Sequence, residues 1–327
     1  MNRYLTTNNH PKIAVIIVNY NGGELLLKCL NHLAKQTIPA HSIYVVDNAS
    51  HDNSIAVCES AFPNVIFIKN DKNVGFAAGN NIAAKLATDC DWLAFLNPDA
   101  FAAPDWLEQH INAIKKYPEY DIFGCRMRDA NRPELLDGTA DIYHISGLAW
   151  RRDHQIANNE RNQFEEIFAA CAAAALCKRD AFIQAGGFDE DYFCYFEDVD
   201  LGFRLRLFGH RCLYVPTAVV DHMGSAITGK TSNFQVYHGH RNMVWTYIKN
   251  MPTFLFWFYL PMHLFMTLVM LGVCLKRGQA KIYIKAKWDA IKNIRKIWAK
   301  RTEIQKHKTA TNASLRKLMA LRFSRNG

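Results

Sequence analysis

Four short apolar segments that alternate with helical patterns constrain the fold more than anything else in this sequence. Each is apolar at successive positions and ends at polar turn residues, and the segments cover residues 13–18, 43–46, 65–69 and 92–96. Strands that are apolar on both faces are typical of a parallel sheet covered by helices on both sides. Right-handed crossovers place the carboxyl ends of such strands at one edge. We therefore predict an α/β fold with a mostly parallel sheet that binds its ligands at this edge.

Polar side chains gather at the predicted edge in a pattern that suits a nucleotide. They are Asn19, Tyr20, Asp47, Asn48, Asn73 and Asp99. Asp47 can accept a hydrogen bond from a base or a ribose hydroxyl, and Gly75 lets the backbone approach a ligand at a helix start. Simple turn chemistry is the alternative for Asp47 and, more strongly, for Asn48. The sequence has no GxGxxG after the first strand and no GxxxxGK[ST], which disfavours a dinucleotide dehydrogenase and a P-loop protein.

The tripeptide Asn97-Pro98-Asp99 directly follows the fourth strand. Proline ends a strand, so Asp99 is held just beyond a buried strand, where open α/β sheets place ligand chemistry. Taken alone, the tripeptide favours a helix-opening turn with Asp99 as a solvated cap. His222 ends another apolar run, and a lone histidine is more often structural. Together with Asp99 it becomes a candidate metal ligand.

A second centre lies at residues 186–201, where six carboxylates fall within 12 residues and alternate with aromatic side chains. A helical pattern follows, so Glu197 and Asp198 lie near a helix N-terminus, where negative charge is stabilised. A carboxylate between aromatic rings suits proton abstraction. The alternative is a capping cluster with an Asp200–Arg204 pair at i,i+4. We accept that alternative for Asp200 but interpret Asp198 as a base.

Further elements are expected along the chain. They are a helix at 105–117, strands at 122–124, 142–150 and 212–215, a loop at 151–163, and a helix carrying His238, His240 and Arg241 that can reach a phosphate. The nine cysteines form no CxxC pair, which favours reduced thiols in a cytosolic protein. The polar N-terminus, MNRYLTTNNHPK, predicts no secretory signal.

The C-terminal region differs from the body in charge and hydropathy. The whole chain carries a net charge of +9, but from Lys276 onward there are 16 lysines and arginines against Asp289 and Glu303. Just before this basic tail, residues 254–275 contain no charged side chain and are long enough to cross a bilayer. The tail alternates lysines with aliphatic residues and tryptophans at helical spacing, which favours membrane lipid over nucleic acid as its partner.

Taken together, these residues resemble the family 2 glycosyltransferases and, within them, the rhamnosyltransferase-like bacterial branch. The resemblance covers roughly residues 11–250 in the family's order. Its motifs are Val18-Asn19-Tyr20-Asn21, Val46-Asp47-Asn48-Ala49-Ser50, Asn73-Val74-Gly75 with Asn80-Asn81, Asn97-Pro98-Asp99, Gly186-Gly187-Phe188-Asp189-Glu190, Glu197-Asp198-Val199-Asp200-Leu201 and His222-Met223-Gly224-Ser225.

The resemblance implies a GT-A fold and inverting transfer from a nucleotide-diphosphate sugar, with rhamnose the favoured sugar. Asp99 and His222 would hold a divalent cation, Mg²⁺ or Mn²⁺, and Asp198 in the "ED" motif, beside Glu197, would deprotonate the acceptor hydroxyl. Asp47 would hold the base. The residues implied in donor binding are Val18, Asn19, Tyr20, Asp47, Asn48, Asn73, Gly75, Asn80, Asn97 and Arg241. Asn97 stands where the family's DxD-like motif begins, so its direct ligation is in doubt.

The same resemblance implies a catalytic domain at 1–250 and a membrane-associating region at 251–327, with a lipid-linked glycan as acceptor. Nucleotide sugars are cytosolic, and a basic tail also stays on the cytosolic side. A single membrane span would put the body and the tail on opposite sides. We therefore predict a re-entrant or in-plane helical pair that is broken near Pro261. A helix that lies on anionic lipid would follow it, at the cytoplasmic face of the bacterial inner membrane. A docked soluble helix and a single span are the alternatives. A non-catalytic subunit that binds sugar nucleotides is the alternative function.

Overall fold

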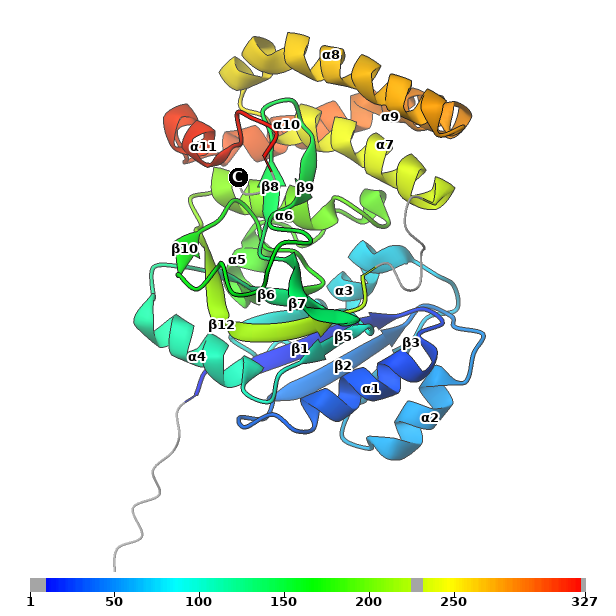
Figure 1. Cartoon of the computed structure of the whole chain (residues 1–327), viewed down its shortest axis with the longest axis vertical. Coiled ribbons are helices and arrows are strands. Elements are labelled where there is room, and N and C mark those ends of the chain that lie inside the picture. Colours follow the sequence, from blue (N-terminus) through cyan, green and yellow to red (C-terminus); the bar gives the residue numbers. More distant parts are fainter. Residues whose placement is uncertain (1–9, 225–231, 325–327) are drawn as a thin grey trace, which may run out of the picture.

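The first strands of the chain form the predicted parallel sheet (Figure 1). The computed structural model describes residues 10–224 and 232–324, so the polar residues 1–9 and Ser225 of the His222 motif lie outside it. The strands β1 (Ile13–Asn19), β2 (Ser42–Asp47), β3 (Ile66–Lys69) and β4 (Trp92–Leu96) stand in the order β4-β1-β2-β3 and are all parallel. The register places Asn19 beside Asp47. The carboxyl ends therefore share one edge, as predicted.

The remainder of the ten-stranded sheet is mixed. β11 (Ala174–Lys178) runs antiparallel between β4 and β6 (Ile122–Asp129), and β12 (Cys212–His222) lies parallel to β6. The other strands, β5 (Ala100–Ala102), β7 (Arg132–Gly138) and β10 (Glu165–Glu166), pair antiparallel with β12, β6 and β12. The predicted parallel pairing is thus found in β1 to β4 and again between β6 and β12, while the other strand pairs are antiparallel. β12 also continues well past the predicted 212–215 and carries His222 to the sheet edge.

Helices cover both faces of the sheet because alternate residues of each buried strand point to opposite sides. Ile13, Val15 and Ile17 of β1 pack in one core with α1 (Gly23–Leu33), α2 (Ser54–Ala61) and α4 (Trp106–Lys116). The alternate residues of β1, which point to the other face of the sheet, pack in a second core with α3 (Gly75–Leu86), α5 (Arg179–Gln184) and α6 (Glu197–Leu207). All nine cysteines are free thiols, as predicted.

A hairpin replaces the single strand predicted at 142–150. β8 (Asp141–Tyr143) and β9 (Ala149–Arg151) pair antiparallel, with Asp141 opposite Arg151. The turn between them needs Gly147, whose φ is +87°. The hairpin reaches from the sheet to the C-terminal helices (Figure 1), where the carbonyl of Ser146 accepts a hydrogen bond from His263 Nδ1 at 2.7 Å. It therefore connects the sheet edge to the C-terminal region.

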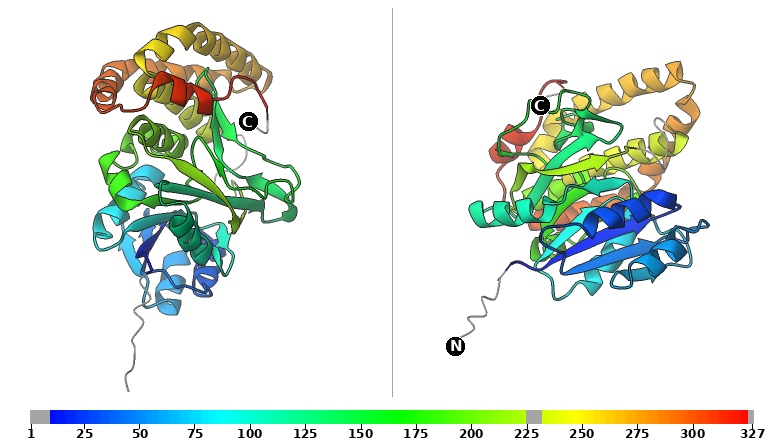
Figure 2. Two further views of the ribbon diagram at one scale, coloured as in Figure 1. Left: turned by 90° about the vertical axis from the view of Figure 1, so that its left-hand side faces the viewer. Right: turned by 60° about the horizontal axis from the view of Figure 1, so that its bottom comes forward.

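The C-terminal helices form a layer at one end of the molecule (Figures 1 and 2). They are α7 (Asn233–Asn250), α8 (Thr253–Lys276), α9 (Ala280–Lys292), α10 (Ile294–Lys306) and α11 (Asn312–Leu318), and a short 3-10 helix, η1 (Glu190–Tyr192), precedes α6. A third core joins Tyr143 and Phe203 of the body to Leu255, Ile297 and Leu315 of this layer. The division at residue 250 stays a prediction.

The predicted break near Pro261 is wrong, because α8 is continuous through it. A proline inside a helix costs about 3 kcal/mol, but Tyr259 and His263 on either side of it are buried against the body and hold both halves in line. α8 is long and apolar enough to cross a membrane by length and composition alone. One face is packed on the protein and the other carries exposed apolar side chains such as Leu264 and Leu268.

Candidate active site

A cleft of about 1020 Å³ lies at the carboxyl ends of β1, β2 and β4, and β12 and the β8–β9 hairpin border it. Most of the site residues that the sequence predicted line this cleft. They are Val18, Tyr20, Asn48, Asn73, Gly75, Asn97, Asp99, Glu197, Asp198 and His222. Residues from distant parts of the chain therefore meet in one cleft that is large enough for a nucleotide sugar.

Asn19 and Asp47 do not line the cleft but join the ends of β1 and β2 behind it. The amide of Asn19 donates to Asp47 Oδ1 at 3.2 Å and also to two serine hydroxyls. Ser50 donates its hydroxyl to Asp47 Oδ1 and its backbone N–H to Oδ2. Their polar atoms hold the adjacent turns together, and the role of both residues in donor binding stays a prediction.

Asn80 and Arg241 also lie outside the cleft lining. Asn80 is buried and donates to the carbonyl of Phe76 one turn earlier in α3. The Arg241 guanidinium donates to the carbonyls of Asp191 and Tyr192 and stacks on Trp245. In this structure the donors of Arg241 hold the η1 segment, and its contact with a phosphate stays a prediction.

Asp99 and His222 face each other across the cleft floor. The antiparallel pairing of β5 with β12 sets His222 opposite Ala100, so His222 Nε2 lies 3.4 Å from Asp99 Oδ1. His222 is 4% exposed, and its Nε2 has no hydrogen-bond partner among the described residues. On its other side, Nδ1 lies 2.8 Å from Asp137 Oδ2. This leaves a buried nitrogen lone pair aimed beside a carboxylate, which is the arrangement of a metal site.

The charges around His222 agree with that arrangement. Burial lowers the pKa of His222, but the hydrogen bond to Asp137 and the charge of Asp99 raise it to about 9. Burial opposes ionisation of Asp137, yet the Arg151 guanidinium beside it and His222 hold its pKa below its usual range. The carboxylates of Asp99 and Asp137 on the two sides of His222 therefore favour positive charge at this position.

Asp198 lies in the first turn of α6, as predicted, and lines the same cleft. Its Oδ1 accepts from the backbone N–H of Val199 at 2.8 Å, and its Oδ2 accepts from Ala172 at 3.2 Å. Asp200 forms the predicted i,i+4 salt bridge with Arg204, with 2.8 Å between the nitrogen and the oxygen, and it does not line the cleft. The neighbouring Glu197 is buried, and burial together with the charge of Asp198 raises its pKa well above the usual range.

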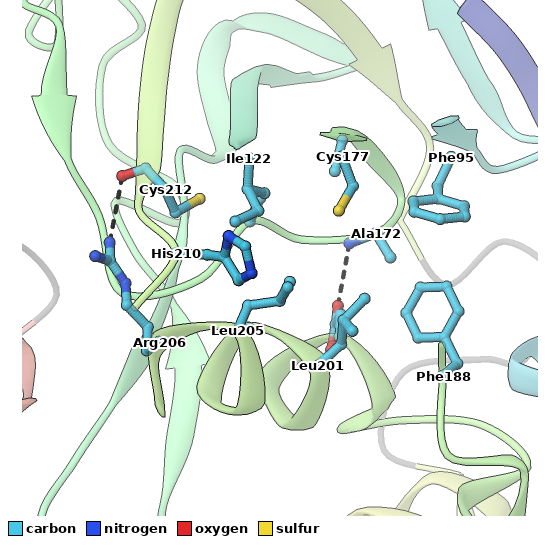
Figure 3. A pocket seen from close by; sticks show the side chains of 14 residues that line it. Phe95, Ile122, Ala172, Cys177, Phe188, Leu201, Leu205, Arg206, His210 and Cys212 are labelled. Carbon is cyan, nitrogen blue, oxygen red and sulfur yellow. Dashed lines mark hydrogen bonds between the residues drawn. The ribbon is translucent and has the colours of Figure 1, made fainter. Parts of the chain in front are cut away.

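A second, much smaller cavity of about 20 Å³ lies behind Asp198 (Figure 3). Its labelled walls include Phe95, Phe188, Leu201 and Leu205, and the dashed line at Ala172 marks the hydrogen bond to Asp198. The carboxylate therefore has hydrocarbon on one side and the open cleft on the other. The hydrocarbon limits the number of water molecules that can reach Asp198, so a ligand would approach the carboxylate from the cleft.

The segment before Asp198 is held in an unusual backbone conformation. Phe193, Tyr195 and Phe196 have positive φ angles of 64°, 67° and 67°, which side chains with a Cβ seldom adopt. The buried amide of Asn242 on α7 donates to the carbonyls of Tyr192, Cys194 and Tyr195 at 2.7–3.0 Å. Asn242 thus compensates for the strain and fixes the backbone that leads into Asp198.

Gly75 serves a different partner from the one expected. A Cβ at this residue would lie 2.6 Å from the carbonyl oxygen of Phe193, and its φ of +86° also requires glycine. The Phe193 carbonyl accepts from the N–H groups of Phe76 and Ala77. The close approach at the start of α3 is therefore made by the protein's own loop, although Gly75 still borders the cleft.

Four further residues line the cleft that the sequence did not predict: Asp137, Asp141, Arg151 and Cys171. Arg151 pairs with Asp137 and donates to Cys171 Sγ at 2.9 Å. The first three belong to β7, β8 and β9, a region the sequence described only as strand and loop. The one available signal was the acidic pair at 137 and 141 amid apolar residues, in Asp137-Gly138-Thr139-Ala140-Asp141.

A mixed α/β sheet with helices on both faces and a carboxylate–imidazole pair at its edge is the architecture of the GT-A fold. The model of Glycosyl transferase family 2 matches residues 14–186, and the chain belongs to this family. The chain is 29% identical over 251 residues to the N-acetylglucosaminyl-diphospho-decaprenol L-rhamnosyltransferase of Mycobacterium tuberculosis, which covers 69% of this chain and 81% of that protein. It is 28% identical over 223 residues to the rhamnosyltransferase WbbL of Escherichia coli, covering 62% and 80%.

Solved structures agree on the fold. The mannosyltransferase PcManGT from Pyrobaculum calidifontis, solved with GDP-Man and Mn²⁺, has a TM-score of 0.53 and 17% identity, over 92% of this chain and 85% of that one. GalNAc-T7, solved with UDP, GalNAc and Mn²⁺, has a TM-score of 0.59 and 16% identity, over 73% of this chain and 48% of that one. At these identities the likeness establishes the fold alone.

Proposed function

We propose that this protein is an inverting, metal-dependent rhamnosyltransferase. It moves the sugar from a nucleotide-diphosphate donor, dTDP-rhamnose in preference to a UDP-hexose, to a hydroxyl of a lipid-linked glycan in bacterial surface polysaccharide synthesis. The observation that carries this proposal is the arrangement of one cleft, in which Asp99 and His222 lie at the sheet edge and Asp198 lies at the start of α6. The names of the two rhamnosyltransferase relatives support the choice of sugar and acceptor.

The residues at the sheet edge fit a divalent cation. His222 Nε2 is buried, unpartnered among the described residues and 3.4 Å from Asp99 Oδ1, and Asp137 fixes the ring from behind. Mg²⁺ prefers oxygen ligands, so the imidazole favours Mn²⁺. When bound, the ion neutralises the negative charge that grows on the diphosphate leaving group.

The donor would lie along the ends of β1, β2 and β4. We assign its nucleotide to the cleft-lining residues Val18, Tyr20, Asn48, Asn73 and Asn97. Asp47 supports this surface from behind, and its Oδ2, which accepts from Ser50 N–H, keeps a lone pair that can hold the base. The polar turn residues after the strands therefore bind the leaving half of the donor.

Asp198 acts on the acceptor. A sugar hydroxyl is a weak nucleophile until its proton is taken, and base catalysis of this kind typically gives ~10²–10⁴-fold. The proton passes to Asp198 as the oxygen attacks the anomeric carbon from the face opposite the diphosphate, which inverts that centre. No covalent enzyme nucleophile takes part, and the two backbone N–H groups on Asp198 hold the carboxylate in place.

The C-terminal layer would bring the protein to its acceptor at the cytoplasmic face of the inner membrane. The outer face of α8 carries the following exposed apolar residues: Phe254, Trp257, Phe258, Met262, Leu264, Phe265, Leu268, Val269 and Leu275. Because its inner face packs on the body, α8 would lie in the plane of the interface rather than cross it. The lysines and arginines of the tail would add attraction to anionic lipid.

The substitution Asp198→Asn tests this function. It keeps the shape of the side chain and removes its basicity, so turnover should fall by about 10²–10⁴-fold. Calorimetry should show that the variant binds the nucleotide sugar with Mn²⁺ about as tightly as the unmodified protein does. A mutant with near-normal turnover would show that the base is elsewhere. An unmodified protein that binds the donor but never transfers sugar would support the non-catalytic subunit instead.

A further inference from the structure

Asp141 lies next to the proposed base, and no motif in the sequence singles it out. One carboxylate oxygen of Asp141, Cys171 Sγ and one carboxylate oxygen of Asp198 lie within 4.8 Å of one another. Asp141 is 7% exposed, and its Oδ2 has no hydrogen-bond partner among the residues that the structure describes. A buried carboxyl oxygen without a partner, beside a second carboxyl group, needs a physical explanation.

Two carboxyl groups this close in a buried setting do not both ionise, so one of them keeps a proton. Asp198 has the better site for a charge, since it accepts from two backbone N–H groups at a helix start and borders the open cleft. The cross-strand partner of Asp141 is Arg151, whose guanidinium is engaged by Asp137 and Cys171. Burial, and then the charge of Asp198, raise the pKa of Asp141 well above its usual range. The proton therefore belongs on Asp141.

A metal ion held by this cluster is disfavoured. Arg151 Nη2 lies 2.9 Å from Cys171 Sγ, so a cation there would face a guanidinium. Burial raises the pKa of the Cys171 thiol well above its usual range, so the sulfur is not a thiolate ligand. The cluster is better described as a protonated carboxyl group, Asp141, beside the carboxylate of Asp198.

We propose that Asp141 is a positioning residue of the transfer reaction: its protonated carboxyl group donates a hydrogen bond to Asp198 and keeps that base oriented and ionised. This inference rests on the proposed function and assigns a further residue to it. During transfer, the acceptor O–H proton moves to Asp198, the new bond to the anomeric carbon forms and the bond to the diphosphate breaks. Asp141 keeps its own proton throughout, and Asp198 later loses the transferred proton to water in the cleft.

Other titratable and charged groups around Asp141 and Asp198 affect which of these two carboxyl groups carries the proton. The titratable and charged side chains that face Asp141 or Asp198 are Asp137 on β7, Arg151 on β9, Cys171, Cys194, Glu197 on α6 and Cys212 on β12. Burial keeps the three thiols protonated, and Glu197 is held neutral as Asp141 is. Asp137 and Arg151 form an ion pair with each other.

Two substitutions of Asp141 test the inference through the pH profile of kcat/KM at saturating Mn²⁺. Asp141→Ala removes the hydrogen-bond donor, so the acid limb should move to higher pH by about one unit, which is a tenfold loss on that limb, and activity should recover at alkaline pH. Asp141→Asn keeps a neutral donor of the same shape, so its acid limb should stay in place with at most a modest loss of kcat. Asp180→Asn, an exposed aspartate with a side chain 89% accessible, is the control.

The opposite result has a clear meaning. If Asp141 is ionised, Asp141→Asn removes a repelling charge and shifts the acid limb to lower pH, which overturns the inference. An unchanged limb in both variants overturns it as well. Infrared spectra of the unmodified protein and of Asp141→Asn supply a second measurement, because only a protonated Asp141 loses a carboxylic-acid band. Failure of the proposed function itself appears separately, as the absence of transfer by the unmodified protein.

Discussion

The ring nitrogen Nδ1 of His222 lies 2.8 Å from Oδ2 of Asp137, and this contact joins β12 to β7 beside the candidate metal position. A carboxylate at Nδ1 holds the proton on that nitrogen, so the lone pair of Nε2 faces Asp99. Asp137 therefore determines which nitrogen of His222 is available as a ligand, although it belongs to none of the motifs that identify the family.

Replacing Asp137 should weaken metal binding before it affects chemistry. Asp137→Asn removes the charge that orients His222, so the Mn²⁺ concentration for half-maximal activity should rise by about 10–100-fold. A metal titration of the transfer rate measures this. Asp221→Asn is the matched control, because Asp221 precedes His222 on the same strand and pairs with Arg128 instead. An unaltered metal requirement in the first variant would contradict the role given to Asp137.

Removing the amide of Asn242 should displace the base. Asn242→Ala frees the carbonyls of Tyr192, Cys194 and Tyr195, so the strained segment before Asp198 relaxes and kcat should fall about 10–100-fold with little change in donor KM. Asn250→Ala is the comparison, because Asn250 is equally buried on α7 but donates to Asp200. Equal losses of kcat in both variants would indicate a general effect on stability rather than on the loop.

A methyl group at Gly75 should be far more harmful than one at Gly186. Both residues have positive φ, +86° and +80°, so alanine costs about 1–2 kcal/mol of backbone strain at either. At Gly75 the added Cβ would also lie 2.6 Å from the Phe193 carbonyl, whereas at Gly186 nothing lies within 4 Å. Thermal unfolding and turnover of Gly75→Ala and Gly186→Ala should separate these effects. Similar values for both variants would show that the loop adjusts freely.

Lys249 should be essential for stability at neutral pH. It is 1% exposed and contacts Asp189 at 2.5 Å and Asp200 at 2.8 Å. Lys249→Met leaves two buried carboxylates without this partner, so the free energy of unfolding should fall by about 3–5 kcal/mol in urea denaturation. Lys285→Met, which breaks an exposed pair with Asp289, should leave the free energy of unfolding nearly unchanged.

Lys249→Met should also change how the free energy of unfolding depends on pH in the acid range. Burial opposes ionisation of Asp189 and Asp200, but Lys249 with Lys300 holds the pKa of Asp189 below its usual range, and Arg204 with Lys249 does so for Asp200. The stability these carboxylates contribute is present above their unfolded pKa of about 3.9 and is lost as the pH falls through the lower folded values. Lys249→Met should lose less stability as the pH falls. The difference in the free energy of unfolding between the variant and the unmodified protein should therefore shrink in acid. A constant difference would contradict the assigned ion pairs.

The outer face of α8 should determine membrane binding. Leu264→Glu with Leu268→Glu places charges on residues that are 56% and 67% exposed, so co-sedimentation with vesicles containing anionic lipid should fall about tenfold or more. Leu86→Glu with Ile183→Glu changes two exposed apolar residues outside this layer and should leave binding intact. Equal losses in both pairs would show that charge alone, not this face, governs attachment.

The sequence supplied the parts of the fold that depend on local patterns. The apolar runs of β1 to β4, the helix that begins at Glu197 and the polar turn ending at Asp99 were all predicted, because periodicity and turn chemistry act over a few residues. The hairpin at 142–150 was missed, since an apolar run interrupted by one glycine resembles a single strand. The continuous α8 was missed because packing of Tyr259 and His263 outweighs the cost of Pro261.

Within the cleft, the sequence by itself determined which residue types are present: the carboxylates Asp99 and Asp198, His222 and the turn amides follow from motifs in chain order. Only the tertiary structure decided what these residues contact. It bonded Asp47 to Asn19 and Ser50, set Asp137 behind His222 and placed Asp141 beside Asp198. The physical reason is that charge and hydrogen bonding act through distance in space, and strands far apart in the chain become neighbours only once the sheet has formed.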